Sequence, residues 1–240
     1  MCQFFSFVGD GFGNYKYLDW EYRKDHLNEN CDSHTFILTH FKIPPKNQDR
    51  FSKYEYNPLT KQFTIDEPVE GHDHEAAENW ANNLNFKTII PQLIIKPIIN
   101  PFSLDIAKIS NEDIILLKQW DSVWASIQAS VWDSVWASVW ASIQASVWAS
   151  VWDSVRVSVW DSVRVSVGDS VWDSVRVSVG DSVRAYISSF FNINYKYDFS
   201  SVNELWNKGI VPSFNGKTWR LHSGKDATII YKWNKNESNT

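Results

Sequence analysis

The stretch from Trp120 to Val183 reads WDSV WASI QASV WDSV WASV WASI QASV WASV WDSV RVSV WDSV RVSV GDSV WDSV RVSV GDSV, sixteen uninterrupted copies of one four-residue unit. The third position is Ser in every copy, and the fourth is Val in fourteen copies and Ile in two. The first position varies among Trp, Arg, Gln and Gly, and the second among Asp, Ala and Val. The fixed pair therefore meets one repeated environment, and the variable positions are expected to face outward.

A four-residue period fits an extended chain better than an α-helix. Four residues advance a helix by about 40° beyond one full turn, so the valines would spiral around its axis in about nine copies. Ser, Val, Trp and Asp are also weaker helix formers than Ala, by about 0.5 kcal/mol each. In extended structure each position keeps its face, because side chains alternate with a period of two. The array is therefore predicted to be a β-solenoid, with a long helix as the alternative.

The charged positions indicate how many residues make one turn of such a solenoid. A turn of twelve or twenty residues stacks Arg on Arg, whereas a turn of sixteen stacks no two arginines. The sixteen-residue turn also lays arginines against tryptophans, which is a favourable cation–π arrangement. We therefore predict a protein-binding surface made of Trp140, Trp148, Trp160, Trp172, Arg156, Arg164 and Arg176.

The residues before the array predict an α+β domain, 1–109. A turn-rich segment at 9–14 separates two expected strands, and residues 57–60 are a typical hairpin connection. Apolar residues at helical spacing predict a helix at 73–84. The other expected elements are strands at 3–8, 15–20, 35–41, 54–56 and 62–65, a helix at 21–28, and covered extended chain at 88–99, which prolines interrupt.

The central segment, 110–183, begins with an expected helix start. Ser110 is a suitable cap because the acid Asp113 follows three residues later. After the array, residues 184–240 return to ordinary composition and predict a small α+β cap. A helix is expected at 202–208, a hairpin around Asn215-Gly216, and a final strand at 228–233. Ordinary segments on both sides would cover the open edges of a solenoid.

The composition excludes several classes of function. The formal net charge is −5, and the array carries seven Asp against three Arg, which opposes binding to nucleic-acid phosphates. The sequence contains no run of about 18 apolar residues, so neither a membrane span nor a membrane partner is expected. Two cysteines are too few for a disulfide framework, and they predict a reducing cytoplasm.

Cys2 is the sharpest sign of enzymatic chemistry. Removal of Met1 would leave an N-terminal cysteine, which can attack a carbonyl with its own amine as the base. His34 could orient or deprotonate this thiol if the fold brings the two together. The position resembles the nucleophile of class II glutamine amidotransferases and of DNA–protein crosslinking proteins that capture abasic sites, although those families have Gly where this chain has Gln3. A buried core cysteine is the alternative.

Two further motifs have a simpler explanation in local structure. His72-Asp73-His74-Glu75 offers zinc ligands, but it lacks a third ligand nearby and fits an acidic helix start, so no metal site is predicted. Gly9-x-Gly11-x-Gly13 lacks the glycine spacing of a dinucleotide-binding loop and precedes a strand. It is interpreted as a turn, and no cofactor is expected.

Three stretches resemble a group of phage and environmental proteins. They are the Met1-Cys2-x-Phe4-x-Ser6 start with residues 32–34, residues 53–60 with 86–102, and the array with 185–191 and 205–222 after it. The resemblance implies a phage setting, with the host cytoplasm as the location, and it implies no mechanism. The resulting hypothesis is a non-enzymatic binding or structural protein whose array is a rigid scaffold or docking surface for another protein or a second copy. The alternative is an enzyme or covalent trap with Cys2 as its nucleophile.

Overall fold

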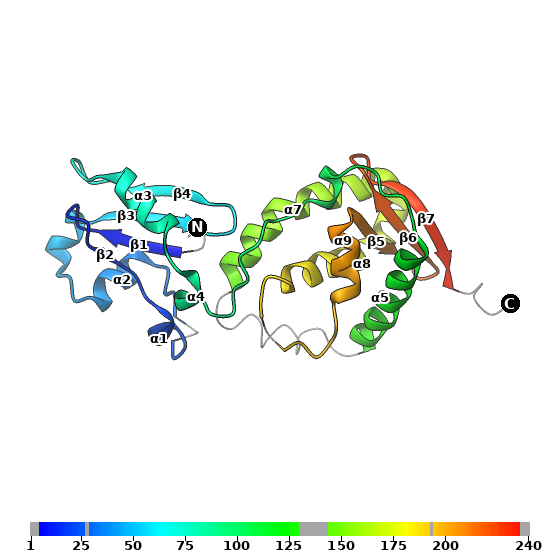
Figure 1. Ribbon diagram of the computed structural model, residues 1–240, viewed down its shortest axis with the longest axis horizontal. Coiled ribbons are helices and arrows are strands. Elements are labelled where there is room, and N and C mark those ends of the chain that lie inside the picture. The colour runs from blue at the N-terminus through cyan, green and yellow to red at the C-terminus, as the bar shows by residue number, and fades with distance from the viewer. Residues whose placement is uncertain (1–4, 27–28, 130–143, 193, 236–240) are drawn as a thin grey trace. The chain divides into compact units, whose positions relative to one another are not determined.

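The computed structural model describes residues 5–26, 29–129, 144–192 and 194–235 (Figure 1). The chain divides into two compact units. The first comprises Met1–Pro97 with Ala137–Ser150, and the second comprises Ile98–Trp136 with Val151–Thr240. None of the described helices is long and apolar enough to cross a membrane.

The first unit is built on a four-stranded antiparallel sheet in the order β2-β1-β3-β4. Phe7 packs against Tyr54 and Trp80 on one face, with ring centroids 5.0 and 4.8 Å away. Val8 belongs to the core on the other face, together with Ile37. All residues of β1 are buried because both faces are covered. The strands are β1 (Phe5–Gly9), β2 (Tyr15–Lys16), β3 (Ser52–Asn57) and β4 (Gln62–Glu67).

Short helices accompany this sheet. The predicted helix at 73–84 and the predicted hairpin around 57–60 are confirmed, whereas the helix expected at 21–28 is only one turn long. The elements are α1 (Trp20–Arg23), α2 (His34–His40), α3 (His74–Asn82), α4 (Phe86–Ile89) and a 3-10 helix, η1 (Pro45–Arg50).

The predicted strand at 35–41 is wrong, because this segment forms helix α2. The Ser33 hydroxyl caps the helix by accepting a hydrogen bond from the N–H three residues later, at 3.4 Å. Within the helix, Thr39 Oγ1 donates to the carbonyl of Thr35 at 2.8 Å. Ile37 is fully buried in the core beside β1. Capping and burial therefore override the strand propensity of the β-branched residues.

The prediction of a β-solenoid for the array is also wrong, because the described array residues lie in helices and not in stacked strands. Gly168 separates two of these helices, and its φ of 78° is incompatible with a continuing helix. The sixteen-residue solenoid turn therefore does not exist in the described part of the array. The helices are α5 (Asn111–Ala129), α7 (Gln144–Val167) and α8 (Asp169–Ser188).

The fixed Ser and Val positions are compatible with helices for two reasons. Serine hydroxyls bond back to the preceding turn: Ser178 Oγ donates to the Val175 carbonyl at 2.8 Å, so a buried serine leaves no donor unpaired. The valines need to face inward only over short stretches, which tolerate a drift of about 40° per copy. The break at Gly168 then lets α8 start afresh. The fully buried valines of α7 are Val151, Val155, Val159 and Val163.

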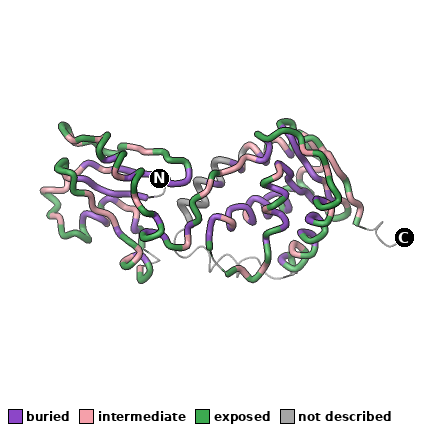
Figure 2. Tube along the Cα trace, in the orientation of Figure 1, coloured by how far each residue is buried: buried purple, intermediate pink, exposed green. Residues whose placement is uncertain are grey.

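The second half of α8 removes the need for a single buried face. Residues 178–183 are all buried, and Figure 2 shows the helix in purple over this part of its length. A helix that is surrounded on every side can turn its valines in any direction without exposing them. The valines rotate around the helix axis from copy to copy, which would expose some of them on a surface helix. In this buried part of α8 the rotation exposes none.

The second unit packs its helices around a three-stranded antiparallel sheet in the order β5-β6-β7. Leu117, Trp120, Leu205 and Trp219 lie in one core, so the helix before the array, the array itself and the C-terminal segment are packed together. The remaining elements are η2 (Pro101–Ser103), α9 (Ser200–Asn207), β5 (Ile210–Phe214), β6 (Thr218–Ser223) and β7 (Thr228–Asn234).

Three expectations for this unit are confirmed. Ser110 and Asp113 form the predicted cap of α5, with the Ser110 hydroxyl donating to the Asp113 carboxylate at 2.7 Å. The hairpin at Asn215-Gly216 joins β5 to β6. The helix expected at 202–208 and the final strand are α9 and β7.

Gly168→Ala and Gly180→Ala are expected to change stability in opposite directions. Gly168 has φ 78° and ψ 156°, a conformation that is essentially restricted to glycine, so Ala should destabilise by about 1–3 kcal/mol through backbone strain, although a Cβ would contact nothing within 4 Å. Gly180 lies inside α8, where a Cβ would meet Trp160 at 3.7 Å, an ordinary contact. Ala there should stabilise by up to about 1 kcal/mol through helix propensity. Urea unfolding measures both, and effects of the same sign would contradict a helix break at Gly168.

Candidate functional site

A groove of about 610 Å³ opens on the second unit. One side is α7, where Ser158 and Ser162 are one helical turn apart on the same face. A second side is the segment 100–106, and a third is the β6–β7 turn with Lys225 and Asp226. The volume lies within the range of about 300–1,000 Å³ that is typical of ligand sites.

Residues 104–109, called the strap from here on, form part of the groove wall. Leu104 has extended backbone angles, φ −87° and ψ 158°, and residues 105–109 form no helix, strand or turn. The Ala107 N–H donates to Ser223 Oγ at 2.9 Å, which fixes the strap to the end of β6. Ile106 packs directly on Gly224, where a Cβ would lie only 3.1 Å from the Cβ of Ile106. The wall is therefore held by both polar and steric contacts.

Several polar groups of the groove are available to a ligand. The Ser162 hydroxyl, the Asp105 and Asp226 carboxylates and the Lys225 ammonium have no hydrogen bond or ion pair within the described part of the chain. Asn100, in contrast, is engaged, because its Nδ2 donates to Ser158 Oγ at 2.8 Å. Within the described part of the chain, the groove thus offers hydroxyl, carboxylate and ammonium groups to a ligand.

His222 forms a buried polar centre in the same unit. Its Nδ1 lies 3.0 Å from the Ala227 carbonyl, so this nitrogen carries the proton and donates it. Its Nε2 accepts from the Ser213 hydroxyl at 2.8 Å. Burial lowers the pKa of His222 to about 4, and the nearby Arg220 adds to the effect, while the Ala227 carbonyl opposes it. The pair has the spacing of a nucleophile and its base, but Ser213 and His222 are both fully buried and closed to substrate.

Asp181 is a second buried polar centre, located in the array. Its carboxylate accepts hydrogen bonds from Trp124 Nε1 at 2.9 Å and from Gln128 Nε2 at 3.1 Å, both of α5. Arg184, one turn further along α8, pairs with it at 3.0 Å. Burial raises the pKa of Asp181 to about 6, although the Trp124, Arg184 and Gln128 contacts oppose the rise. The ionised form of Asp181 is therefore destabilised by its burial in the folded chain.

Asp121, at the same position of the repeat, is held differently. Its Oδ1 accepts a hydrogen bond from Trp219 Nε1 at 2.9 Å, and the Lys235 ammonium pairs with the same oxygen at 2.7 Å. The two carboxylates that are buried in the described part of the array therefore both accept an indole N–H. They differ in the cation beside them, because Asp121 meets an ammonium from the C-terminal segment.

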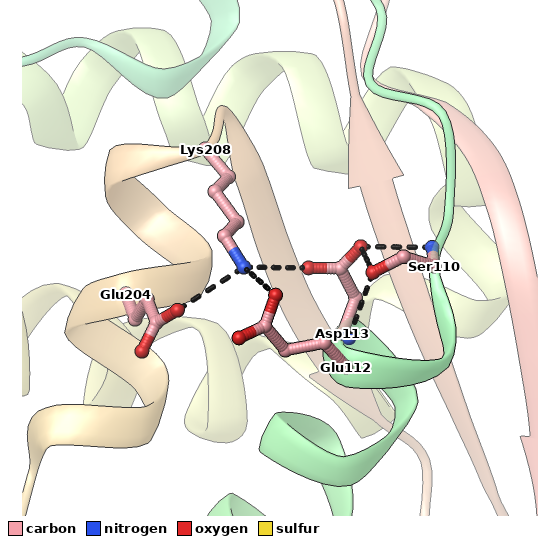
Figure 3. A network of polar contacts seen from close by, with 5 residues as sticks. All are labelled: Ser110, Glu112, Asp113, Glu204 and Lys208. Carbon is pink, nitrogen blue, oxygen red and sulfur yellow. Dashed lines mark hydrogen bonds and ion pairs between the residues drawn. The ribbon is translucent and has the colours of Figure 1, made fainter.

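Lys208 connects the start of α5 to the end of α9 through three carboxylates (Figure 3). Its Nζ lies 3.3 Å from Glu112, 3.2 Å from Asp113 and 3.1 Å from Glu204. Asp113 also accepts a hydrogen bond from the Ser110 N–H at 2.9 Å. Burial alone would raise the pKa of Asp113, but the bonds from Ser110 and Lys208 outweigh it and lower the pKa. The network fastens two helices together.

Lys208→Met is expected to lower the free energy of unfolding by about 0.5–1 kcal/mol, because three carboxylates would lose their shared cation. High salt should shrink the difference, since it screens charges that are partly exposed. Lys108→Met is the matched control, because Lys108 is exposed and makes no ion pair in the described part of the chain. Urea unfolding at low and high salt measures the effect. Equal losses in the two variants would contradict a role for the network.

The proposed pairing of Cys2 with His34 stays a prediction, because Cys2 lies outside the described residues. The structure does place the other partner. His34 is buried, its Nε2 donates to the Tyr54 carbonyl at 3.0 Å, and its Nδ1 lies 3.4 Å from the Asp66 carboxylate. The Tyr54 carbonyl therefore fixes Nε2 of His34 as a donor, and Asp66 is an ion-pair partner of Nδ1 only when the ring is protonated.

The histidines at 72 and 74 serve local structure. His72 Nδ1 lies 2.8 Å from Ser52 Oγ, and His74 Nδ1 lies 3.0 Å from the Tyr54 hydroxyl. Asp73 caps α3, which confirms the interpretation of this motif as a helix start. Within the described ranges, no group of three His, Cys, Asp or Glu side chains is placed to hold a metal ion.

The predicted binding residues of the array follow helical geometry where they are described. Trp140 lies outside the described residues, as does the side chain of Trp148. The Arg156 guanidinium lies over the ring of Trp160, one helical turn away, at 4.9 Å from its centroid. Trp160 in turn meets Trp172 of α8 edge to face at 5.5 Å. These contacts join α7 to α8.

The other two predicted arginines are exposed. Arg164 pairs with Asp169 at 2.7 Å across the helix break, and Arg176 lies on the outside of α8. Val165 and Val177, which follow them in the repeat, are 81% and 51% exposed. Arg164, Val165, Arg176 and Val177 thus form an outer surface that mixes charge with apolar side chains. The expectation that the variable positions face outward is wrong for others, since Trp120, Asp121 and Asp181 are buried.

The groove cannot be predicted from the sequence, because its lining comes from α7, the strap and the β6–β7 turn, which are far apart along the chain. The one available signal is the fixed Ser position, since a four-residue spacing puts Ser158 and Ser162 on one face only if the array is helical.

No protein-family model, curated protein or solved structure matches the chain.

Proposed function

We propose that the chain is a non-enzymatic binding or scaffold protein, whose repeat helices carry a docking surface for another protein or for a second copy. The division of the repeat into buried and exposed positions supports this. At the fixed position of α7, Val151, Val155, Val159 and Val163 are buried. At a variable position, Val165 and Val177 are exposed beside arginines. Exposed apolar side chains next to arginine are typical of surfaces that partners cover.

The state of His222 supports binding over catalysis. Both of its ring nitrogens have internal partners, and its side chain is fully buried. A general base needs a free lone pair within reach of substrate. His222 instead stabilises the fold.

A reducing cytoplasm is the proposed setting, and the host cytoplasm follows if the chain belongs to a phage, as its resemblance implies. Cys31 supports a reducing compartment, because it is a free and buried thiol. Burial raises the pKa of Cys31, so the thiol stays protonated and unreactive at neutral pH.

A photo-reactive phenylalanine analogue at position 165 or 177 of the full chain tests the docking surface. Irradiation in expressing cells should give a discrete cross-linked product with one protein or with a second copy. The same analogue in place of Glu75, an exposed residue of α3, is the control and should give none. No product at either array position, or an identical product from position 75, would contradict the proposal.

A further inference from the structure

We infer that the groove between α7, the strap and the β6–β7 turn binds an extended peptide segment of a partner protein. The inference rests on the proposed binding function and names a second place where that function is exerted. It follows from three features of the groove: backbone N–H and carbonyl groups without a hydrogen-bond partner, charged side chains without an ion-pair partner, and exposed apolar side chains.

The strap offers main-chain hydrogen bonds. The backbone N–H and carbonyl groups of Asp105 and Ile106 have no partner in the described part of the chain, and both residues are exposed and line the groove. An extended peptide that lies beside the strap can hydrogen-bond to these groups, as an added strand does at the edge of a sheet. The main-chain hydrogen bonds would provide affinity, and every second side chain of the peptide would provide specificity. The Ala107–Ser223 bond and the contact of Ile106 with Gly224 hold the strap in position for this.

The side chains define the chemistry of the peptide. Leu104 and Ile106 are 38% and 55% exposed, so they offer apolar surface to every second side chain of a strand. Asp105 and Asp226 outnumber Lys225, which leaves the rim with one net negative charge and favours a peptide that carries a cationic residue. The Ser162 hydroxyl, free on the α7 side, can bond a peptide carbonyl or amide.

A random heptapeptide library displayed on particles is the probe, panned in parallel on the full chain and on Ser162→Trp. The indole should fill the groove from α7, so enriched peptides should bind the variant at least about tenfold more weakly. Ser174→Trp is the matched control, because Ser174 holds the same repeat position but lies exposed on α8. Its affinity should equal that of the unchanged chain. N-methylation of one strap-facing amide of the best peptide should also cost about tenfold.

The charges give a test that does not depend on the fold of Ser162→Trp. Asp226→Lys reverses an exposed charge of the wall formed by the β6–β7 turn. This variant should select peptides with fewer cationic residues. Peptides that bind Ser162→Trp as well as the unchanged chain, or an unchanged charge preference in Asp226→Lys, would overturn the inference. Cross-links from position 165 would persist in that case, so the docking surface of the array and the groove can fail separately.

Discussion

Asp181→Asn is expected to raise the free energy of unfolding at about pH 8 by up to about 3 kcal/mol. Burial raises the pKa of Asp181 from 3.8 to about 6, so the folded chain holds an ionised carboxylate above pH 6 at a cost that the unfolded chain avoids. The difference between these pKa values corresponds to about 3 kcal/mol. The amide oxygen can still accept from Trp124 and Gln128, and Arg184, which is 41% exposed, can turn to solvent.

The sign of the pH dependence distinguishes this explanation from better packing. A folded pKa above the unfolded value means that the folded chain binds more protons between about pH 4 and 6. The cost of Asp181 is therefore absent near pH 4 and complete above about pH 6. The gain from Asp181→Asn should disappear on acidification. Urea unfolding at a series of pH values measures it, and a gain that is the same at pH 4 and pH 8 would contradict the assignment.

Asp121→Asn is the matched control for that experiment. The residue occupies the same repeat position and also accepts an indole N–H, but its Oδ1 pairs with the Lys235 ammonium at 2.7 Å. The amide oxygen can still accept both hydrogen bonds but carries no negative charge to pair with the ammonium, so the variant should be less stable than the unchanged chain. Opposite signs at two equivalent repeat positions would show that the surrounding cation and not the repeat determines the cost.

Local signals were sufficient for much of the two α+β segments. Asn215-Gly216 predicts its hairpin because few residue pairs adopt the required backbone angles, and Ser110 with Asp113 predicts the start of α5 through reciprocal hydrogen bonds. The segment 35–41 forms a helix although its β-branched residues indicate a strand, because Ser33 caps the helix and Ile37 is buried. Burial is a tertiary property that the segment does not contain.

The array differs from its prediction for a related reason. A four-residue period disfavours one long helix against one surface, whereas Gly168 divides the array and residues 178–183 of α8 are all buried. Serine back-bonding, as at Ser178, removes the cost of burying the fixed position. The groove could not be predicted either, since it depends on how α7, the strap and a distant turn come together. The serines of the groove, Ser158 and Ser162, indicate a shared polar face only once the array is known to be helical.

His222→Asn is expected to remove the contribution of His222 to stability, which decreases in acid. Burial lowers the pKa of His222 from 6.5 to about 4, so the unfolded chain binds a proton that the folded chain excludes over this interval. The stability contributed by neutral His222 is complete above pH 6.5 and is lost as the pH falls to about 4, by about 3 kcal/mol in all. Asn keeps an N–H donor for the Ala227 carbonyl and does not titrate.

The two buried groups act in opposite directions over nearly the same interval, which makes the variants informative together. Between about pH 6 and 4 the folded chain gains a proton at Asp181, while the unfolded chain gains one at His222, so the two contributions largely cancel. Asp181→Asn should therefore reveal stability that falls with acidification, and His222→Asn stability that rises. The double variant should be flat again. Slopes of the same sign in the two single variants, or a His222 NMR resonance that titrates near pH 6.5, would contradict the burial that the structure assigns to these side chains.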